Sequence, residues 1–240
     1  TYIRLTSAAR LQIRRLKMIN VKENIRKLQD SLPKGVGLVA VSKFHPVELL
    51  REAYDAGQRI FGESRAQELL LKVGQMPDDV KWHFIGHLQT NKVRAIVPYV
   101  AMIHSIDSEK LLRVVDSEAE RAGRVVDVLL QLHVAQEETK YGMTADECVA
   151  MVESGVLAEL THVRVCGVMG MATNTDDENE IRAEFRKTKQ VFDLLHEGCL
   201  HDSDCFREIS MGMSDDYQIA VEEGSTLVRV GHSIFGERQY

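Results

Sequence analysis

The segment "GLVAVSK" (residues 37–43), followed by "PVELLREAYDAG" (residues 46–57), sets the pattern from which the fold is predicted. The first stretch is short, apolar and rich in valine, which is typical of a buried strand. The second stretch places apolar residues three and four positions apart and ends in glycine, as amphipathic helices do. Together they are predicted to form one β/α unit.

The same alternation of strand and helix patterns continues to the end of the chain. Helical patterns lie at residues 64–76, 108–123 and 180–198, and no linker rich in proline, glycine or serine divides the chain. Eight strands with helical crossovers in about 220 residues predict a single-domain α/β fold, the TIM (β/α)8 barrel. An open doubly wound sheet is the alternative, because it also alternates strands and helices. The other seven strands are predicted at residues 59–63, 81–86, 102–107, 125–135, 164–171, 206–212 and 226–232.

The composition argues against several classes of protein. The chain has 240 residues, 44% hydrophobic and 28% charged, which is typical of a soluble globular protein with a sizeable core. No apolar run approaches the roughly 18 residues of a membrane span. The formal net charge of −6 argues against a nucleic-acid-binding surface. The four cysteines form no CxxC pair and no metal-ligand spacing, so free thiols in a reducing, cytoplasmic setting are expected.

The first 17 residues, "TYIRLTSAARLQIRRLK", differ in composition from the rest of the chain. They carry five basic residues and no acidic one, which superficially fits an organellar transit peptide. Met18 opens a convincing helix pattern, "MINVKENIRKLQDSLP", that is closed by Pro33. An artificial leader is the plainer interpretation, and the domain is predicted to span residues 18–240.

Lys43 stands where the first predicted strand ends. Chemistry in TIM barrels gathers at the C-terminal ends of the strands. Val39 and Val41 share the side of Lys43 by the alternation of a strand. Apolar surroundings disfavour the charged amine, so we expect a lowered pKa and a nucleophilic lysine able to form an imine with an aldehyde or ketone. The alternative is a strand-end lysine whose ammonium group reaches solvent.

The last two predicted strands end in motifs suited to an anion. "SMGMS" (residues 210–214) and "RVGHS" (residues 229–233) combine glycines and hydroxyls with backbone N–H groups. The loops after strands seven and eight are the recurrent phosphate site of TIM barrels. Alternatively, Gly212 and Gly231 serve only tight turns. A reactive lysine and a phosphate site in one barrel mouth together point to a phosphorylated aldehyde.

Arg229 is a permanent charge inside an apolar strand, "TLVRVG" (residues 226–231). By strand alternation its side chain faces away from those of Val228 and Val230. A buried guanidinium needs a partner, and a ring nitrogen or a carboxylate of a ligand would serve. An ion pair with a core acid is the alternative.

His83 and His87 are four residues apart in "HFIGH", but the segment is predicted to run from a strand into a loop. No HExxH motif accompanies them, so we expect no metal site here.

Six motifs resemble, in order and spacing, the pyridoxal-phosphate homeostasis proteins, single-domain relatives of the alanine racemase barrel. The motifs are "VAVSK", "FGES-R-QE", "WHFIGHLQTNK", "EETKYG", "SMGMSDD" and "RVG-SIFGER", and the resemblance covers residues 19–238. It implies pyridoxal 5′-phosphate as the cofactor, held as a Schiff base on Lys43, with Arg229 facing the pyridine nitrogen. It also implies phosphate contacts from Ser210 and from the backbone of Gly231 and His232, and a role in cofactor handling for Lys140.

Three positions depart from the pattern of the family. Ser64 stands where members usually have asparagine, which makes a contact to the cofactor ring weaker or water-mediated. His232 replaces a common threonine, so imidazole or backbone would have to bind phosphate in place of the hydroxyl. His133 replaces a usual asparagine.

The function implied by the resemblance is cofactor buffering and delivery. The chain would be a non-catalytic, monomeric cytoplasmic carrier that passes pyridoxal phosphate to apo-enzymes and has neither nucleic-acid nor membrane partners. A racemase-type enzyme is one alternative, but the racemases take a second acid/base, a tyrosine, from an additional β domain. Only Tyr217 or Tyr141 could substitute for it here. A cofactor-free Schiff-base aldolase acting on a sugar phosphate is the other alternative.

Overall fold

A computed structural model describes residues 19–135 and 141–237. The predicted leader, residues 1–17, and Lys140 lie outside the described residues, so the predictions made for them stay predictions.

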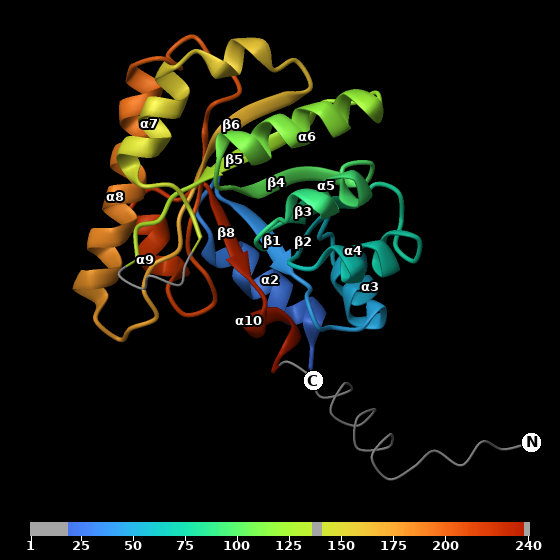
Figure 1. Cartoon of the computed structure of the whole chain (residues 1–240). Helices are drawn as coiled ribbons and strands as arrows, with labels where there is room; N and C mark the ends of the chain where they lie inside the picture. The colour runs from blue at the N-terminus through green and yellow to red at the C-terminus, as the bar shows by residue number, and fades with distance from the viewer. Residues whose placement is uncertain (1–18, 136–140, 238–240) are drawn as a thin grey trace, which may run out of the picture.

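The strands close into a parallel barrel in which each strand pairs with its neighbours in sequence and β1 pairs with β8 (Figure 1). The predicted TIM barrel is confirmed, and the open sheet is excluded by the four residue pairs that join β1 to β8. All eight predicted strands are present. Their bounds are β1 Gly37–Val41, β2 Ile60–Glu63, β3 Lys81–Phe84, β4 Val100–Ile106, β5 Val126–Gln131, β6 Val163–Met169, β7 Glu208–Ser210 and β8 Leu227–Val230.

The helices form the outer layer of the barrel (Figure 1). Capping side chains define several of their starts: the side chain of Asp177 accepts from the N–H groups of Asn179 and Glu180, and Thr144 and Glu147 form a capping box. The helices are α2 Val21–Ser31, α3 Val47–Asp55, α4 Ala66–Val73, α5 Thr90–Ile96, α6 Glu109–Arg121, α7 Ala145–Glu153, the 3₁₀ helix η1 Val156–Glu159, α8 Glu178–Glu197, α9 Tyr217–Glu222 and α10 His232–Phe235.

Two apolar clusters hold the barrel together. The larger cluster packs the outward faces of the strands against the helices and includes Phe61, Ile103 and Val228. The smaller one comprises Met102, Leu129, Cys166, Met169 and Leu227. Met102 and Leu227 share the strand side of His104 and Arg229, so this second cluster fills the interior of the barrel. Burial of both strand faces explains why the strands read as continuous apolar runs.

Seven of the eight predicted strands are shorter in the structure, and the ends of β5 and β1 matter most for the site. β5 ends at Gln131, whose side-chain amide donates to the carbonyl of Tyr141 at 2.8 Å, and Leu132 pairs with Met143 instead of continuing the barrel. β1 ends at Val41, so Lys43 lies in the following turn and not on the strand itself. Both segments extend past the C-terminal end of the barrel, where ligands bind in this fold.

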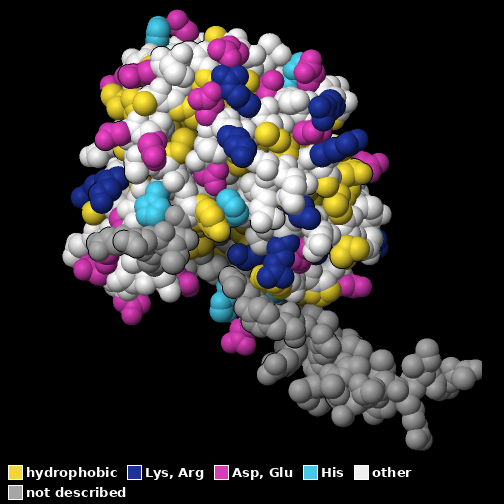
Figure 2. All heavy atoms as spheres, viewed as in Figure 1, with side chains coloured by type: hydrophobic (Ala, Val, Ile, Leu, Met, Phe, Trp, Pro, Cys, Tyr) yellow, Lys and Arg dark blue, Asp and Glu magenta, His cyan; other side chains and the backbone are white. Residues whose placement is uncertain are grey.

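The surface mixes both signs of charge. In Figure 2, acidic and basic side chains alternate over the visible face. Many of them pair, for example Arg186 with Glu223 at 2.8 Å. Within the described residues, no helix combines the length and the apolarity needed to cross a bilayer.

The four cysteines are free thiols, as predicted from their spacing. Burial raises the pKa of the Cys148 and Cys166 thiols to about 12, which leaves both protonated and unreactive at neutral pH.

Candidate functional site

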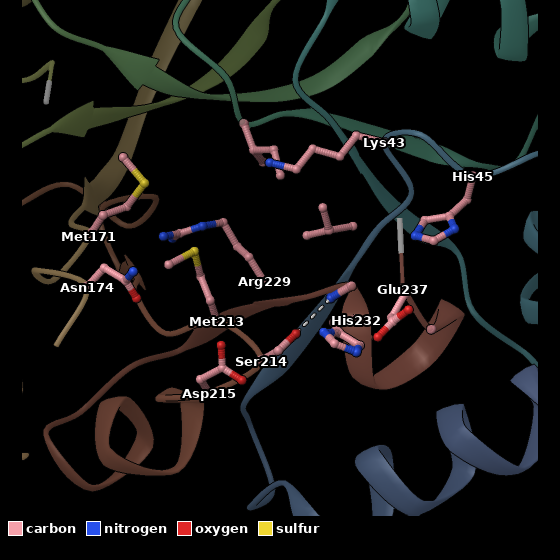
Figure 3. A pocket seen from close by; sticks show the side chains of 14 residues that line it. Lys43, His45, Met171, Asn174, Met213, Ser214, Asp215, Arg229, His232 and Glu237 are labelled. Atoms are coloured by element: carbon pink, nitrogen blue, oxygen red, sulfur yellow. Dashed lines mark hydrogen bonds between the residues drawn. The ribbon is translucent and has the colours of Figure 1, made fainter. Parts of the chain in front are cut away.

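A cavity of about 590 Å³ opens where strands β1, β3, β6, β7 and β8 end (Figure 3). Four of the six predicted cofactor residues line it: Lys43, Arg229, Gly231 and His232. The other lining residues are Val41, His45, Ile85, Met171, Asn174, Met213, Ser214, Asp215, Gly236 and Glu237. The sequence therefore located the mouth of the barrel correctly.

Lys43 enters the cavity from the turn after β1 and is half-buried. In Figure 3 its side chain extends over the cavity on the side opposite Ser214 and His232. Val41 and Ile85 supply apolar wall beside it. This arrangement differs from a lysine that reaches only into solvent, and it gives the amine access to a bound ligand.

Arg229 is buried inside the barrel, with 4% of its surface exposed. Its Nη1 donates to the backbone oxygen of Ser210 at 2.8 Å and to Ser210 Oγ at 2.6 Å, and Nη2 donates to the carbonyl of Gly170 at 3.1 Å. Burial lowers the pKa of Arg229 to about 10, which still leaves it charged at neutral pH. Among the described residues no carboxylate forms an ion pair with it, and the negative charge of Asp216 acts on it only from a greater distance, so the alternative of a core acid partner fails there. Its charge is available to a ligand in the cavity.

Ser210 lies behind Arg229 and does not line the cavity. Its hydroxyl is fully buried, accepts from Arg229 and contacts His104 Nδ1 at 3.0 Å. His104 Nε2 in turn lies 2.9 Å from His83 Nδ1. Sequence reasoning missed this series of hydrogen bonds because its four residues lie on four separate strands. Ser210 is thus placed to orient Arg229, and the phosphate contact predicted for it stays a prediction.

Burial lowers the pKa of His83 to about 3 and that of His104 well below its ordinary value, so both imidazoles are neutral. Ser210 Oγ already accepts from Arg229, which leaves its own proton to donate to His104 Nδ1. His104 then carries its proton on Nε2 and donates to His83 Nδ1. This arrangement gives each hydrogen bond of the chain one donor and one acceptor.

The two buried histidines predict a loss of stability in mild acid. Because their folded-state pKa values lie below the ordinary 6.5, the unfolded chain binds protons first as the pH falls. Their contribution is complete above about pH 6.5 and is lost towards pH 3, at up to about 1.4 kcal/mol per pH unit for each histidine. We expect urea unfolding between pH 7 and 5 to show this slope and His83→Gln to reduce it. His201→Gln, at an exposed position, should leave the slope unchanged.

The opposite wall of the cavity offers hydrogen-bond donors. The Ser214 hydroxyl accepts from Gly231 N at 3.4 Å, and His232 follows at the start of α10 (Figure 3). A Cβ at position 231 would lie 2.9 Å from the carbonyl oxygen of Val41, so only glycine lets β8 approach β1 this closely. Gly212 adopts a φ of +91° and does not line the cavity. The tight-turn interpretation therefore suffices for Gly212, whereas Gly231 also shapes the site.

The formal charges around the cavity balance. Lys43 and Arg229 are opposed by Asp215 and Glu237. An anion would therefore be held by directed O–H and N–H donors near Ser214 and Gly231 more than by net positive charge.

Four residues that were discussed in the sequence lie outside this cavity: Ser64, His133, Tyr141 and Tyr217. Ser64 packs against Gly86 and lines a separate depression together with Arg65 and His87. His133 donates its backbone N–H to Met143 at 2.8 Å. Tyr141 stacks on the His87 ring at 3.6 Å, and Tyr217 begins α9.

Several lining residues were missed in the sequence, and two of them, Ser214 and His45, stand in stretches that were quoted. Ser214 belongs to the quoted "SMGMS" motif, but the resemblance to the family was applied only to its first serine, Ser210. His45 follows Lys43 by two residues in "FHP" and is buried beside the Phe235 ring at 5.1 Å between centroids. No His/Cys/Asp/Glu group suited to a metal occurs among residues 19–135 and 141–237.

Comparison with known proteins places this barrel in a family. The sequence model of the alanine racemase N-terminal domain matches residues 17–239. A pyridoxal phosphate homeostasis protein from Aquifex aeolicus is 36% identical over 228 residues, which cover 93% of this chain and 98% of that protein. The protein of the same name from Schizosaccharomyces pombe is 41% identical over 212 residues, 88% of this chain and 87% of that one.

A solved relative has the same architecture. PipY from Synechococcus elongatus, solved without pyridoxal phosphate, superposes with a TM-score of 0.84 at 37% identity and covers 90% of this chain and 100% of its own. The structure of PipY with pyridoxal phosphate bound gives a TM-score of 0.81 at 36% identity, with the same coverage. The chain therefore belongs to the pyridoxal phosphate homeostasis proteins, within the alanine racemase class of barrels.

Proposed function

We propose that the protein binds pyridoxal 5′-phosphate as a Schiff base on Lys43 and acts in intracellular vitamin B6 homeostasis by buffering and delivering the cofactor. The observation that carries this proposal is that Lys43 and Arg229 line one cavity at the C-terminal end of the barrel, and that Arg229 forms no ion pair with a described carboxylate. The names of the relatives and the pyridoxal phosphate bound to PipY support it.

The donor set of the cavity fits each part of this cofactor. The neutral amine of Lys43 suits the aldehyde, since the two condense to an imine with loss of one water. The guanidinium of Arg229 suits the unprotonated pyridine nitrogen as a hydrogen-bond donor. Ser214, Gly231 and His232 suit the phosphate. Ser210 acts from behind by orienting Arg229, and Ser64 would act on the ring only through an intervening water.

The same residues favour a carrier over an enzyme. Bound pyridoxal phosphate supplies an electron sink for carbanions, and this sink is strongest when the ring nitrogen is protonated. Arg229 cannot give up its proton at neutral pH and opposes a second positive charge beside it. Neither Tyr141 nor Tyr217, the residues considered for a second acid/base, lines the cavity. We therefore propose delivery of the cofactor to apo-enzymes without robust turnover.

The absorption spectrum of the purified protein, before and after borohydride, tests this function. We expect a yellow imine band that disappears on reduction, with a pyridoxyl-phosphate mass fixed on Lys43 in the peptide map. A Schiff-base aldolase would instead be colourless and trapped only when a sugar phosphate is added. A protein that stays colourless with added pyridoxal phosphate would refute the proposal.

A further inference from the structure

A buried ionic cluster lies directly behind the turn that carries Lys43. It consists of Lys72 and Glu68 on α4 and Glu63 at the end of β2, and we call it the Lys72 cluster. The Lys72 side chain is 6% exposed and that of Glu63 is fully buried. Lys72 Nζ donates to Glu63 Oε1 at 2.8 Å, to Glu68 Oε1 at 2.6 Å and to the carbonyl of Ser42 at 2.8 Å. All three donors of the ammonium group are thus used.

The Lys72 cluster forms hydrogen bonds to the residues on both sides of Lys43. On one side, Ser42 Oγ donates to Glu63 Oε1 at 2.6 Å, and the Ser42 carbonyl accepts from Lys72. On the other side, the N–H of Phe44 donates to Glu68 Oε1 at 2.5 Å. Every bond that Lys72 makes therefore leads, directly or through one carboxylate, to a residue adjacent to Lys43.

The turn itself is strained at Phe44. Phe44 has a φ of +65° and is the one non-glycine residue with positive φ in the described chain. A side chain in this left-handed region costs free energy, so the conformation persists only where its surroundings impose it. The bond from Phe44 N–H to Glu68 helps to impose it, together with the turn bond from His45 N–H to the Ser42 carbonyl at 3.1 Å and the Arg65 guanidinium, 4.7 Å from the centre of the Phe44 ring. Lys43, which lies between Ser42 and Phe44 in this turn, lines the cavity.

Stability alone does not account for the Lys72 cluster. Glu63 Oε2 is buried and has no hydrogen-bond partner among the described residues, and desolvation raises the pKa of Glu63. Well-packed apolar side chains in place of a buried ion pair are often neutral or stabilising. A cluster of three charges with one unsatisfied oxygen is therefore better explained by what it orients than by what it stabilises.

We propose that Lys72, Glu63 and Glu68 are positioning residues that hold the strained Ser42–Phe44 turn and so aim Lys43 at the cofactor. This inference rests on the proposed function of Lys43. It extends that function to residues that touch neither the cavity nor a ligand in it. Lys72→Met and Glu68→Ala should both loosen the turn, and Glu68→Ala is the milder test because Glu68 is partly exposed.

The test compares Glu68→Ala with Glu109→Ala, which removes an i,i+4 ion pair of the same spacing but at an exposed place on α6, far along the chain from the site. In the apoprotein, the Phe44 amide of Glu68→Ala should exchange hydrogen at least about tenfold faster, because a bond to a charged acceptor is lost. With pyridoxal phosphate, imine formation should slow by about the same factor if the turn must order first. Glu109→Ala should match the wild type in both measurements.

A second substitution separates positioning from general stability. Glycine adopts a φ of +65° without penalty, so adding Phe44→Gly to Glu68→Ala should restore much of the imine rate. An unchanged rate in Glu68→Ala, or a slow rate that Phe44→Gly leaves slow, would overturn the inference. If the wild type forms no imine on Lys43, the proposed function fails by itself, whereas unchanged Phe44 exchange in the apoprotein would refute the positioning role.

Discussion

Lys43→Ala is expected to abolish the covalent adduct with pyridoxal phosphate while retaining weak binding of the cofactor. The alanine removes the amine that would form the imine but leaves Ser214, Gly231 and His232 in place. Their contacts to phosphate would persist, so the dissociation constant should rise by about two orders of magnitude, or ~2.7 kcal/mol. Absorbance and borohydride trapping measure the imine, and fluorescence titration measures the residual binding.

Lys34→Ala is the matched control for this prediction. Lys34 is exposed and precedes β1, so it lies at the opposite end of the strand that leads to Lys43. The Lys34→Ala variant should form the imine as the wild type does. A reducible adduct that survives in Lys43→Ala would move the Schiff base to another lysine, and peptide mapping would then decide whether Lys140 carries it.

The barrel could be predicted from the sequence because the residues within each β/α unit are enough to indicate its strand and its helix. Strands buried on both faces read as apolar runs, and the helices between them carry three-and-four spacing and glycine stops. Strand lengths could not be predicted, because they depend on bonds to distant residues. β7 has only three residues, and β5 stops where Gln131 turns to bond Tyr141.

Those parts of the site could be predicted that depend on the alternation of side chains along a strand or on the end of a strand. Alternation set the Arg229 side chain opposite to Val228 and Val230, and position at a strand end predicted Lys43 at the mouth of the barrel. Ser210 also points inward, but the structure shows its hydroxyl bound to Arg229 and His104. The Lys72 cluster was missed because a lysine in "AQELLLKV" is expected on the solvent side of its helix. Its burial follows only from the packing of α4 against β2 and the Lys43 turn.

Arg229→Glu is the second prediction with a large expected effect, and it acts on both stability and chemistry. The substitution removes three hydrogen bonds to Ser210 and Gly170 and buries a carboxylate without a cationic partner. We expect the apoprotein to lose roughly 3–5 kcal/mol of unfolding free energy, as for a buried charge deprived of its counter-charge. Bound pyridoxal phosphate should restore part of the lost unfolding free energy. The carboxylate favours protonation of the neighbouring ring nitrogen and would then have a cationic partner.

Protonation of the ring nitrogen also strengthens the electron sink, so Arg229→Glu should speed side reactions with amino acids, such as racemisation of alanine, by at least about tenfold over the wild type, a change of ~1.4 kcal/mol in barrier. Arg229→Gln is the matched control, since its neutral amide removes the same guanidinium without favouring a protonated ring. Urea unfolding with and without cofactor, together with the racemisation rate, separates the two effects. If Arg229→Glu and Arg229→Gln share one absorption spectrum and one rate, Arg229 does not face the ring nitrogen, and its role is confined to ordering Ser210 and the end of β6.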